Sequence, residues 1–248
     1  MKIIVMLVLV SILQKASAQQ DTLTAFDKNL VQTLGSFLKS QKNNVLAENG
    51  LGGTFSEVLK NGSKQVIKGS ARSTITDMLG NTNGENLLSL PFNLQQNKDL
   101  FLQKGKASLL NNFQTNLNNA GKQALQDGMQ IFIGNAFEKL VDNLINVATS
   151  PAGTNTDSLM LAQTKTIKDD YKTNFLPFAQ KAMKTYKMAN QAKKITKFLR
   201  KNNAPNSDVN VEDMLTNGLW EKVNGNVLKN LNGAKQNPLN ILRGLFGE

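Results

Sequence analysis

The residues with the clearest chemical pattern are the cations between Lys172 and Lys201, a stretch without any acidic residue. Its basic residues are Lys172, Lys181, Lys184, Lys187, Lys193, Lys194, Lys197, Arg200 and Lys201. At about 100° per residue the last five share one face of a helix, and Ala192, Ile195, Phe198 and Leu199 share the other. Basic amphipathic helices lie on anionic membranes or follow phosphate backbones. We therefore predict an anionic-surface patch made of Lys193, Lys194, Lys197, Arg200 and Lys201. The same pattern also fits a surface helix whose lysines are only solvated.

Carboxylates are the other residues that can do chemistry. Asp169 and Asp170 are adjacent, so on a helix they point about 100° apart and do not converge on one substrate. Asp208, Glu212 and Asp213 fall where a helix is expected to start, and negative charge there complements the helix dipole. Neither group has the spacing of a calcium-binding loop. We therefore predict no catalytic residue, no metal site and no cofactor.

Cysteine and histidine are both absent from the chain. Their absence excludes disulfides, thiol nucleophiles, Ser-His triads and the usual zinc sites. Any enzyme built from this chain would rely on carboxylates, Ser, Thr, Lys or Tyr, and nothing near Lys60 or Tyr186 singles either one out. The prediction is a non-enzymatic protein, stabilised by burial alone.

The first eighteen residues have the three parts of a secretory signal peptide. Lys2 supplies the basic start, residues 3–13 form an apolar run, and Ala16-Ser17-Ala18 is a small-x-small cleavage site. The run is shorter than the roughly 20 residues that a membrane-spanning helix needs. We expect the mature chain to begin at Gln19 and to be secreted, or periplasmic if the source is a Gram-negative bacterium.

The formal net charge of the chain is +11, which falls to +9 without Lys2 and Lys15. Such an excess favours anionic partners, namely lipid head groups, acidic glycans or acidic proteins, or only keeps the protein in solution. Nucleic acid is disfavoured as a partner because the protein is expected to be exported. Asn61-Gly62-Ser63 is an N-glycosylation sequon, which matters only if the source is a eukaryote.

Apolar residues recur at steps of three and four along the rest of the chain, and no long run alternates with period two. The first such stripe is Leu23, Phe26, Leu30, Leu34, Phe37 and Leu38. This pattern predicts an all-α fold, with residues 19–248 forming a single multi-helix, bundle-like domain of at least six helices. The predicted core includes Phe132, Phe137, Leu140, Leu144, Leu219 and Trp220.

Several expected breaks organise these helices. Residues 87–92 are predicted to lie extended over the core, and residues 99–148 to be helical with soft interruptions at Gly105, Gly121, Gly128 and Gly134. The next helix is expected to bury Leu159, Ala162, Thr166, Ile167 and Tyr171. Pro177 is expected to separate that helix from the basic segment, because proline disrupts a helix interior. Residues 204–207 are expected to form the next loop.

Five short segments together resemble one family. They are Phe55 to Gly62, Leu88 to Pro91, Asn118 to Ala124, Asn174 to Pro177, and an ending that contains Gly218-Leu219-Trp220, Asn237-Pro238 and Leu242 to Gly247. Their order is similar to that in DUF4197, a family of secreted or periplasmic proteins of unknown function. The resemblance implies a signal peptide and one helical domain, with no assigned activity. Asn224 to Asn230 depart from the acidic run and Arg that the family carries there.

Three classes of function remain open from the sequence. The first is a secreted, non-enzymatic binding or interaction protein. The second is a binder of an anionic membrane surface or of an apolar ligand, through the basic helix 193–201 or through a cavity between helices near residues 131–145. The third is a carboxylate-based enzyme. A cavity above about 300 Å³ would favour an apolar ligand.

Overall fold

The computed structural model describes residues 54–80, 86–136, 138–140, 142–143 and 156–234, together with seven residues between 25 and 36. The described part is all-α, with no strand, which confirms the predicted fold class. Its elements are α3 (Thr54–Gly80), α4 (Phe92–Gln96), α5 (Lys98–Gln103), α6 (Ala107–Asp127), the π-helical turn η1 (Ile131–Ala136), α8 (Thr156–Thr185), α9 (Met188–Lys201) and α10 (Val211–Ala234). The predicted signal peptide lies outside the described residues.

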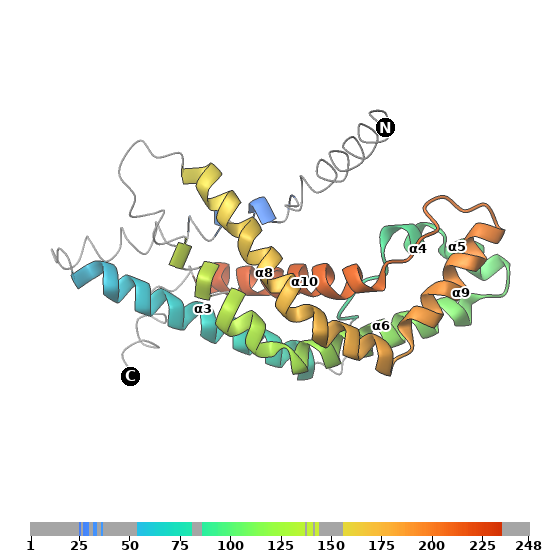
Figure 1. Cartoon of the computed structure of the whole chain (residues 1–248), viewed down its shortest axis with the longest axis horizontal. Coiled ribbons are helices and arrows are strands. Elements are labelled where there is room, and N and C mark those ends of the chain that lie inside the picture. Colours follow the sequence, from blue (N-terminus) through green and yellow to red (C-terminus); the bar gives the residue numbers. More distant parts are fainter. Residues whose placement is uncertain are drawn as a thin grey trace, which may run out of the picture.

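The helices form a main body and a smaller end (Figure 1). In the body, α6, α8 and α10 pack against one another, and α3 packs against α10, α6 and η1. At the other end α9 packs on α6, and the short helices α4 and α5 lie beside it. We call residues 91–106 and 188–210 the basic end, because this part of the chain carries eight Lys and Arg against two Asp.

The core lies between α6, α8 and α10 and is rich in aromatic contacts. Phe132, Leu140, Leu219 and Trp220 are all at most 1% exposed, as predicted. Tyr171 is central, because its ring centroid lies 4.6 Å from that of Phe132 and 4.9 Å from that of Trp220. The predicted core residues Phe137 and Leu144 lie outside the residues whose side chains are described.

Helix α6 runs through Gly121 without interruption, whereas it ends at Gly128, as predicted. Both glycines are packing positions. A Cβ atom on Gly128 would lie 2.5 Å from Cε2 of Phe175, and one on Gly121 would lie 3.0 Å from Cδ1 of Leu88. These positions therefore let a ring and a leucine approach the helix backbone. The predicted interruption at Gly105 is present as well, because Gly105 lies between α5 and α6, where its φ is +64°. A positive φ is the conformation that glycine adopts without strain.

Residues 86–91 are non-helical and bury Leu87 and Leu88, as the sequence predicts, but Phe92 does not lie over the core: it begins α4 and is exposed. Two side chains of α6 form hydrogen bonds with the backbone of this segment, as a neighbouring strand would do in a sheet. The amide of Leu88 donates to Asn118 Oδ1 at 2.9 Å, and its carbonyl accepts from Gln114 Nε2 at 2.7 Å. Buried backbone polar groups need such partners, so these contacts make it favourable to hold the segment against the core.

Helix α8 departs from two expectations. It runs through Pro177 instead of ending there. On both sides of that proline the helix buries Phe175 and Ala179, so packing offsets the lost backbone hydrogen bond. Its buried face includes Ile167 and Tyr171, as predicted, but Ala162 and Thr166 are exposed, whereas Thr164 and Lys168 are buried. Burial of a lysine explains the error, since an apolar pattern assigns charged residues to the solvent.

Candidate functional site

The predicted patch lies on α9, whose position is set by both of its faces. Helix α9 follows a two-residue turn after α8, in which Lys187 has a φ of 53° and the carbonyl of Tyr186 accepts from Gln191 Nε2 at 3.1 Å. On its inner side α9 buries Met188, Ala192, Ile195 and Leu199. The ring centroid of Phe198 lies 4.5 Å from that of Phe101 on α5. These contacts fix the rotation of α9 about its axis.

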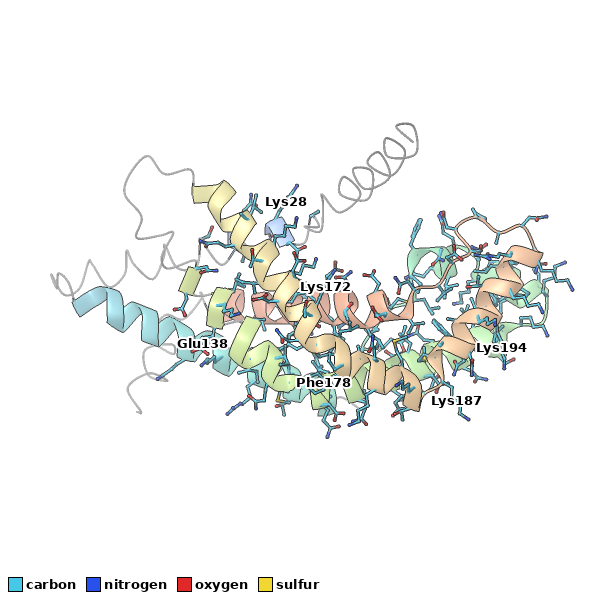
Figure 2. The ribbon with its side chains drawn as sticks, viewed as in Figure 1. Lys28, Glu138, Lys172, Phe178, Lys187 and Lys194 are labelled. Atoms are coloured by element: carbon cyan, nitrogen blue, oxygen red, sulfur yellow. The ribbon has the colours of Figure 1, made fainter. Side chains whose placement is uncertain are left out.

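All five predicted patch residues are exposed: Lys193, Lys194, Lys197, Arg200 and Lys201. They lie on the side of α9 opposite its buried residues, so the charge separation expected at helical spacing is present in the fold. Arg200 is engaged with Asp208, at 2.6 Å between Nη2 and Oδ1. The other four form no ion pair with any residue that the structure describes. Figure 2 places Lys194 and Lys187 toward the same end of the molecule.

Some nearby cations add to this positive charge, and another is neutralised by an acidic partner. Lys98, Lys104 and Lys106, on and after α5, are exposed in the basic end, which has a net charge of +6 from eight Lys and Arg and two Asp. Lys181 on α8 is instead paired with Asp127 at 2.8 Å. The hydrogen bond from Lys181 lowers the pKa of that carboxyl below its ordinary value. The positive charge of the 172–201 segment is therefore concentrated toward its α9 half.

The predicted carboxylates lie in separate places. Asp170 pairs with Lys139 at 2.8 Å, and Asp169 is exposed. At the start of α10 the amide of Asp213 donates to Asn210 Oδ1 at 3.1 Å, which makes Asn210 the capping side chain. Glu212 accepts from Gln180 Nε2 at 3.3 Å. The structure thus gives Asp170, Glu212 and Asp213 local partners, and no described contact joins the two groups.

The structure describes the side chain of only one of three further residues that the sequence singled out, Lys60, Asn61 and Tyr186. Lys60 and Asn61 belong to α3, in the portion whose side chains lie outside the described residues. Tyr186 is half-buried in the α8–α9 turn. Among the described residues no group of three or more His, Cys, Asp or Glu could hold a metal ion. Within the same residues, no helix is both long enough and apolar enough to cross a membrane.

Sequence reasoning missed a buried ion pair. Lys168 Nζ lies 2.6 Å from Oδ2 of Asp27, with side-chain exposures of 1% and 0%. The second oxygen of Asp27 accepts from Trp220 Nε1 at 2.9 Å. A signal was present, because each charged residue occupies an apolar stripe: Asp27 lies four residues after Leu23, and Lys168 lies three before Tyr171. Two opposite charges on apolar faces indicate a buried pair.

The electrostatics around this ion pair follow from burial. Tyr171 donates its hydroxyl to the carbonyl of Thr216 at 3.1 Å, and burial raises the pKa of that hydroxyl well above its ordinary value. Burial also raises the pKa of Glu221; the nearby charge of Lys168 opposes this rise, and that of Asp27 adds to it. The ion pair is sealed from solvent, so it does not form an accessible reaction site; it joins Asp27 to Lys168 of α8, and Asp27 in turn to Trp220 of α10.

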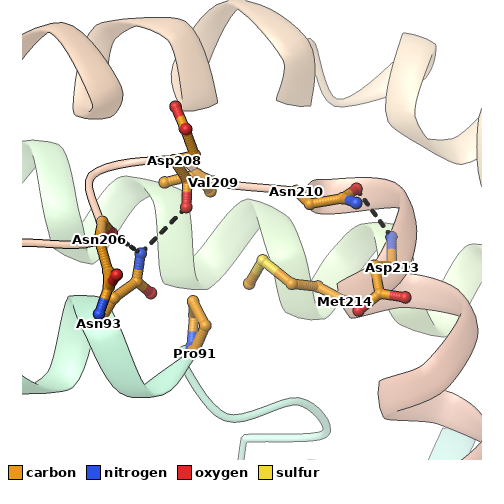
Figure 3. Close-up of a pocket in the computed structure, with 8 residues that line it drawn as sticks. All are labelled: Pro91, Asn93, Asn206, Asp208, Val209, Asn210, Asp213 and Met214. Atoms are coloured by element: carbon orange, nitrogen blue, oxygen red, sulfur yellow. Dashed lines mark hydrogen bonds between the residues drawn. The ribbon is translucent and has the colours of Figure 1, made fainter. Parts of the chain in front are cut away.

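A hollow of about 330 Å³ lies between α4, the α9–α10 loop and the start of α10 (Figure 3). Its lining is Pro91, Asn93, Asn206, Asp208, Val209, Asn210, Asp213 and Met214. Asn93 Nδ2 donates to the carbonyls of Asn206 and Asp208 at 2.6 and 3.0 Å. Five of its eight lining residues are polar or charged, and the lining shares no residue with the cavity considered near 131–145. The hollow therefore does not provide the expected apolar site.

The comparisons with known proteins agree with the resemblance carried by the sequence motifs. No curated protein and no solved structure matches the chain. One family model, described as a protein of unknown function (DUF4197), matches residues 30–230. This range includes the buried lysine of α8, the whole of α9 and most of α10. Since the match covers most of the chain, the protein belongs to the DUF4197 family.

Proposed function

We propose that this protein is a non-enzymatic binding protein that associates with an anionic surface through the basic face of α9. The observation that carries the proposal is the exposure of Lys193, Lys194, Lys197 and Lys201 on one helix face, without an ion-pair partner among the described residues. Unpaired lysines on a rigid helix present their charge at low ordering cost, because the helix already holds their backbones in place.

The expected binding free energy is large enough for reversible association. Each Lys or Arg near an anionic lipid surface contributes about 1 kcal/mol, so the five residues of the face contribute about 5 kcal/mol. The Arg200 charge is partly neutralised by Asp208, whereas Lys98, Lys104 and Lys106 of the basic end add to the attraction. Such binding weakens as salt rises, because the Debye length falls from about 10 Å at 0.1 M to about 3 Å at 1 M.

Binding is favoured over catalysis because the candidate acids already have local roles. Asp170 pairs with Lys139, Glu212 accepts from Gln180, and Asp213 sits in a capped first turn. Catalytic sites usually bring titratable groups together in a cleft with perturbed pKa values. As part of the same proposal, export of the protein would limit the anionic partner to lipid head groups, acidic glycans or acidic proteins.

Charge reversal on α9 tests the proposal. The double variant Lys194→Glu/Lys197→Glu is compared with wild type on heparin-agarose, a purely anionic polymer surface. Its matched control is Lys222→Glu/Lys229→Glu, which changes the net charge equally at two exposed positions of α10. We expect the α9 variant to elute at clearly lower salt than the control, because its four added negative units lie within the binding face.

The melting temperature of the α9 variant should stay within about 2 °C of wild type, since exposed substitutions change stability by about 0.5 kcal/mol or less. Equal elution of the α9 variant and its control would overturn the proposal, because retention would then depend on net charge alone.

A further inference from the structure

We propose that the anionic surface is a lipid bilayer, and that Phe92 and Leu102 enter its apolar layer beside the basic face of α9. This inference rests on the proposed function and names its substrate class. The feature that carries it is the exposure of two large apolar side chains in the basic end, 71% for Phe92 and 54% for Leu102. Among the residues that the structure describes, Phe92 and Leu102 are the large hydrophobic side chains that are exposed rather than buried or half-buried.

The exposure of both residues follows from how α4 and α5 pack. Helix α4 buries Leu94 completely, and Phe92 lies two positions earlier, on the opposite side of the helix. Helix α5 buries Phe101 completely, which turns the next residue, Leu102, outward. Neither side chain belongs to the core cluster, so no intramolecular packing accounts for an apolar residue at these positions.

Both short helices are fixed next to α9. Phe101 of α5 packs on Phe198 of α9, with ring centroids 4.5 Å apart. Asn93 of α4 donates to the carbonyls of Asn206 and Asp208, in the loop that leaves α9. Figure 1 shows α4, α5 and α9 together at one end of the molecule. The protruding apolar side chains and the lysines of α9 are thus carried by one packed unit.

This combination fits a bilayer better than the other anionic partners. Peripheral membrane proteins combine Lys and Arg, which contact anionic head groups, with Phe, Leu or Trp, which enter the acyl boundary below them. An acidic glycan offers negative charge but no apolar layer. The net charge of +6 on the basic end supplies the complementarity to an anionic head-group layer.

The test measures co-sedimentation of the full chain with vesicles of phosphatidylglycerol and phosphatidylcholine. In the variant Phe92→Ser/Leu102→Ser we expect vesicle affinity to fall at least roughly tenfold, because two apolar side chains no longer move from water into the acyl layer. Its matched control, Gln96→Ser/Gln103→Ser, places the same residue at exposed polar positions of the same two helices and should bind like wild type. Elution of both variants from heparin-agarose should be unchanged, because their charges are unchanged.

A second variant reports insertion directly. Phe92→Trp should retain binding, and its exposed indole should shift to shorter emission wavelength on these vesicles and be quenched by brominated acyl chains. The native Trp220 is 1% exposed within the core, so it contributes a constant background.

The outcomes separate this inference from the proposed function. Loss of heparin retention in the α9 charge reversal, with Phe92→Ser/Leu102→Ser binding vesicles like wild type, would uphold the basic face and overturn insertion. Retention on heparin without any wild-type binding to vesicles would also overturn the bilayer. A change from dimer to monomer in Phe92→Ser/Leu102→Ser, with unchanged vesicle binding, would assign the two residues to a contact between copies of this chain.

Discussion

Lys168 and Lys194 are the same residue type on consecutive long helices, yet the fold uses them in opposite ways. Lys168 on α8 is 1% exposed and lies 2.6 Å from a fully buried Asp27. Lys194 on α9 is exposed and forms no ion pair among the described residues. The first charge is compensated inside the protein, and the second is exposed to solvent.

This difference shows that the role of a lysine depends on the groups around it and on its exposure to solvent. A buried ammonium is tolerated only where a partner and hydrogen bonds replace its water. Asp27 supplies that partner, and Trp220 satisfies the other carboxylate oxygen. A solvated ammonium needs no partner, so Lys194 contributes to surface potential rather than to stability.

The largest expected effect comes from removing the buried cation. We expect Lys168→Met to lower the free energy of unfolding by about 3–5 kcal/mol, because the carboxylate of Asp27 would remain buried and uncompensated. Urea unfolding followed by circular dichroism measures this loss. The control Lys194→Met should lie within about 0.5 kcal/mol of wild type.

The double variant Asp27→Asn/Lys168→Met sharpens the same comparison. It removes both charges while keeping an oxygen that can accept from Trp220 Nε1. We expect it to recover most of the stability lost by Lys168→Met. A loss below about 1 kcal/mol in Lys168→Met alone would mean that the two lysines differ less than their exposure implies.

A smaller effect is expected at Glu221, which is half-buried near the ion pair. Its pKa is raised above the ordinary value of 4.5, mainly by burial, so ionisation is less favourable in the folded chain than in the unfolded one. Stability from this group is therefore present at pH values below 4.5 and lost as the pH rises through the folded pKa.

Glu221→Gln should consequently be more stable than wild type at pH 7, by at most about 1 kcal/mol because water screens a half-exposed group. At pH 3.5 the two proteins should unfold at nearly the same temperature, since both side chains are then mostly neutral. Thermal unfolding at these two pH values measures the difference. A variant that is less stable than wild type at pH 7 would contradict the prediction.

The smallest effect is expected at the exposed pair of Arg200 and Asp208, whose side chains are 64% and 81% exposed. Asp208→Asn should change the free energy of unfolding by less than about 1 kcal/mol. The same change releases the Arg200 charge to the basic face, so elution from heparin-agarose should move to slightly higher salt. A large loss of stability without any shift in elution would show that this pair acts structurally, like that of Lys168.

Individual side chains show which parts of the fold could be predicted from the sequence. The two faces of α9 were predicted residue by residue, because a helix of fixed period converts spacing directly into direction. Phe132, Leu140, Leu219 and Trp220 were predicted in the core on the same grounds, and all four are buried. Asn118 was not assigned a role, since its bond to the backbone of Leu88 joins residues 30 positions apart.

Other features escaped prediction because they depend on contacts between distant segments. Pro177 is tolerated inside α8 because that helix is packed on both sides of it, a condition that local propensity does not contain. Phe92 was predicted to lie over the core and Leu102 had no predicted role, but the burial of Leu94 and Phe101 places both side chains on the outside of their helices. The candidate membrane contact therefore emerged only when α4 and α5 were placed against α9 and its loop.

The sequence by itself determined the all-α class, the helical stripes, the basic face of α9 and the family. These properties follow from composition and from periodicity along one helix, which need no knowledge of neighbours. Only the tertiary structure decided that Lys168 is an internal counter-ion for Asp27, that Arg200 is tied to Asp208 and that Lys193, Lys194, Lys197 and Lys201 are left unpaired among the described residues. The physical reason is that the energy of a charge depends on its solvent exposure and on its nearest opposite charge, and folding sets both.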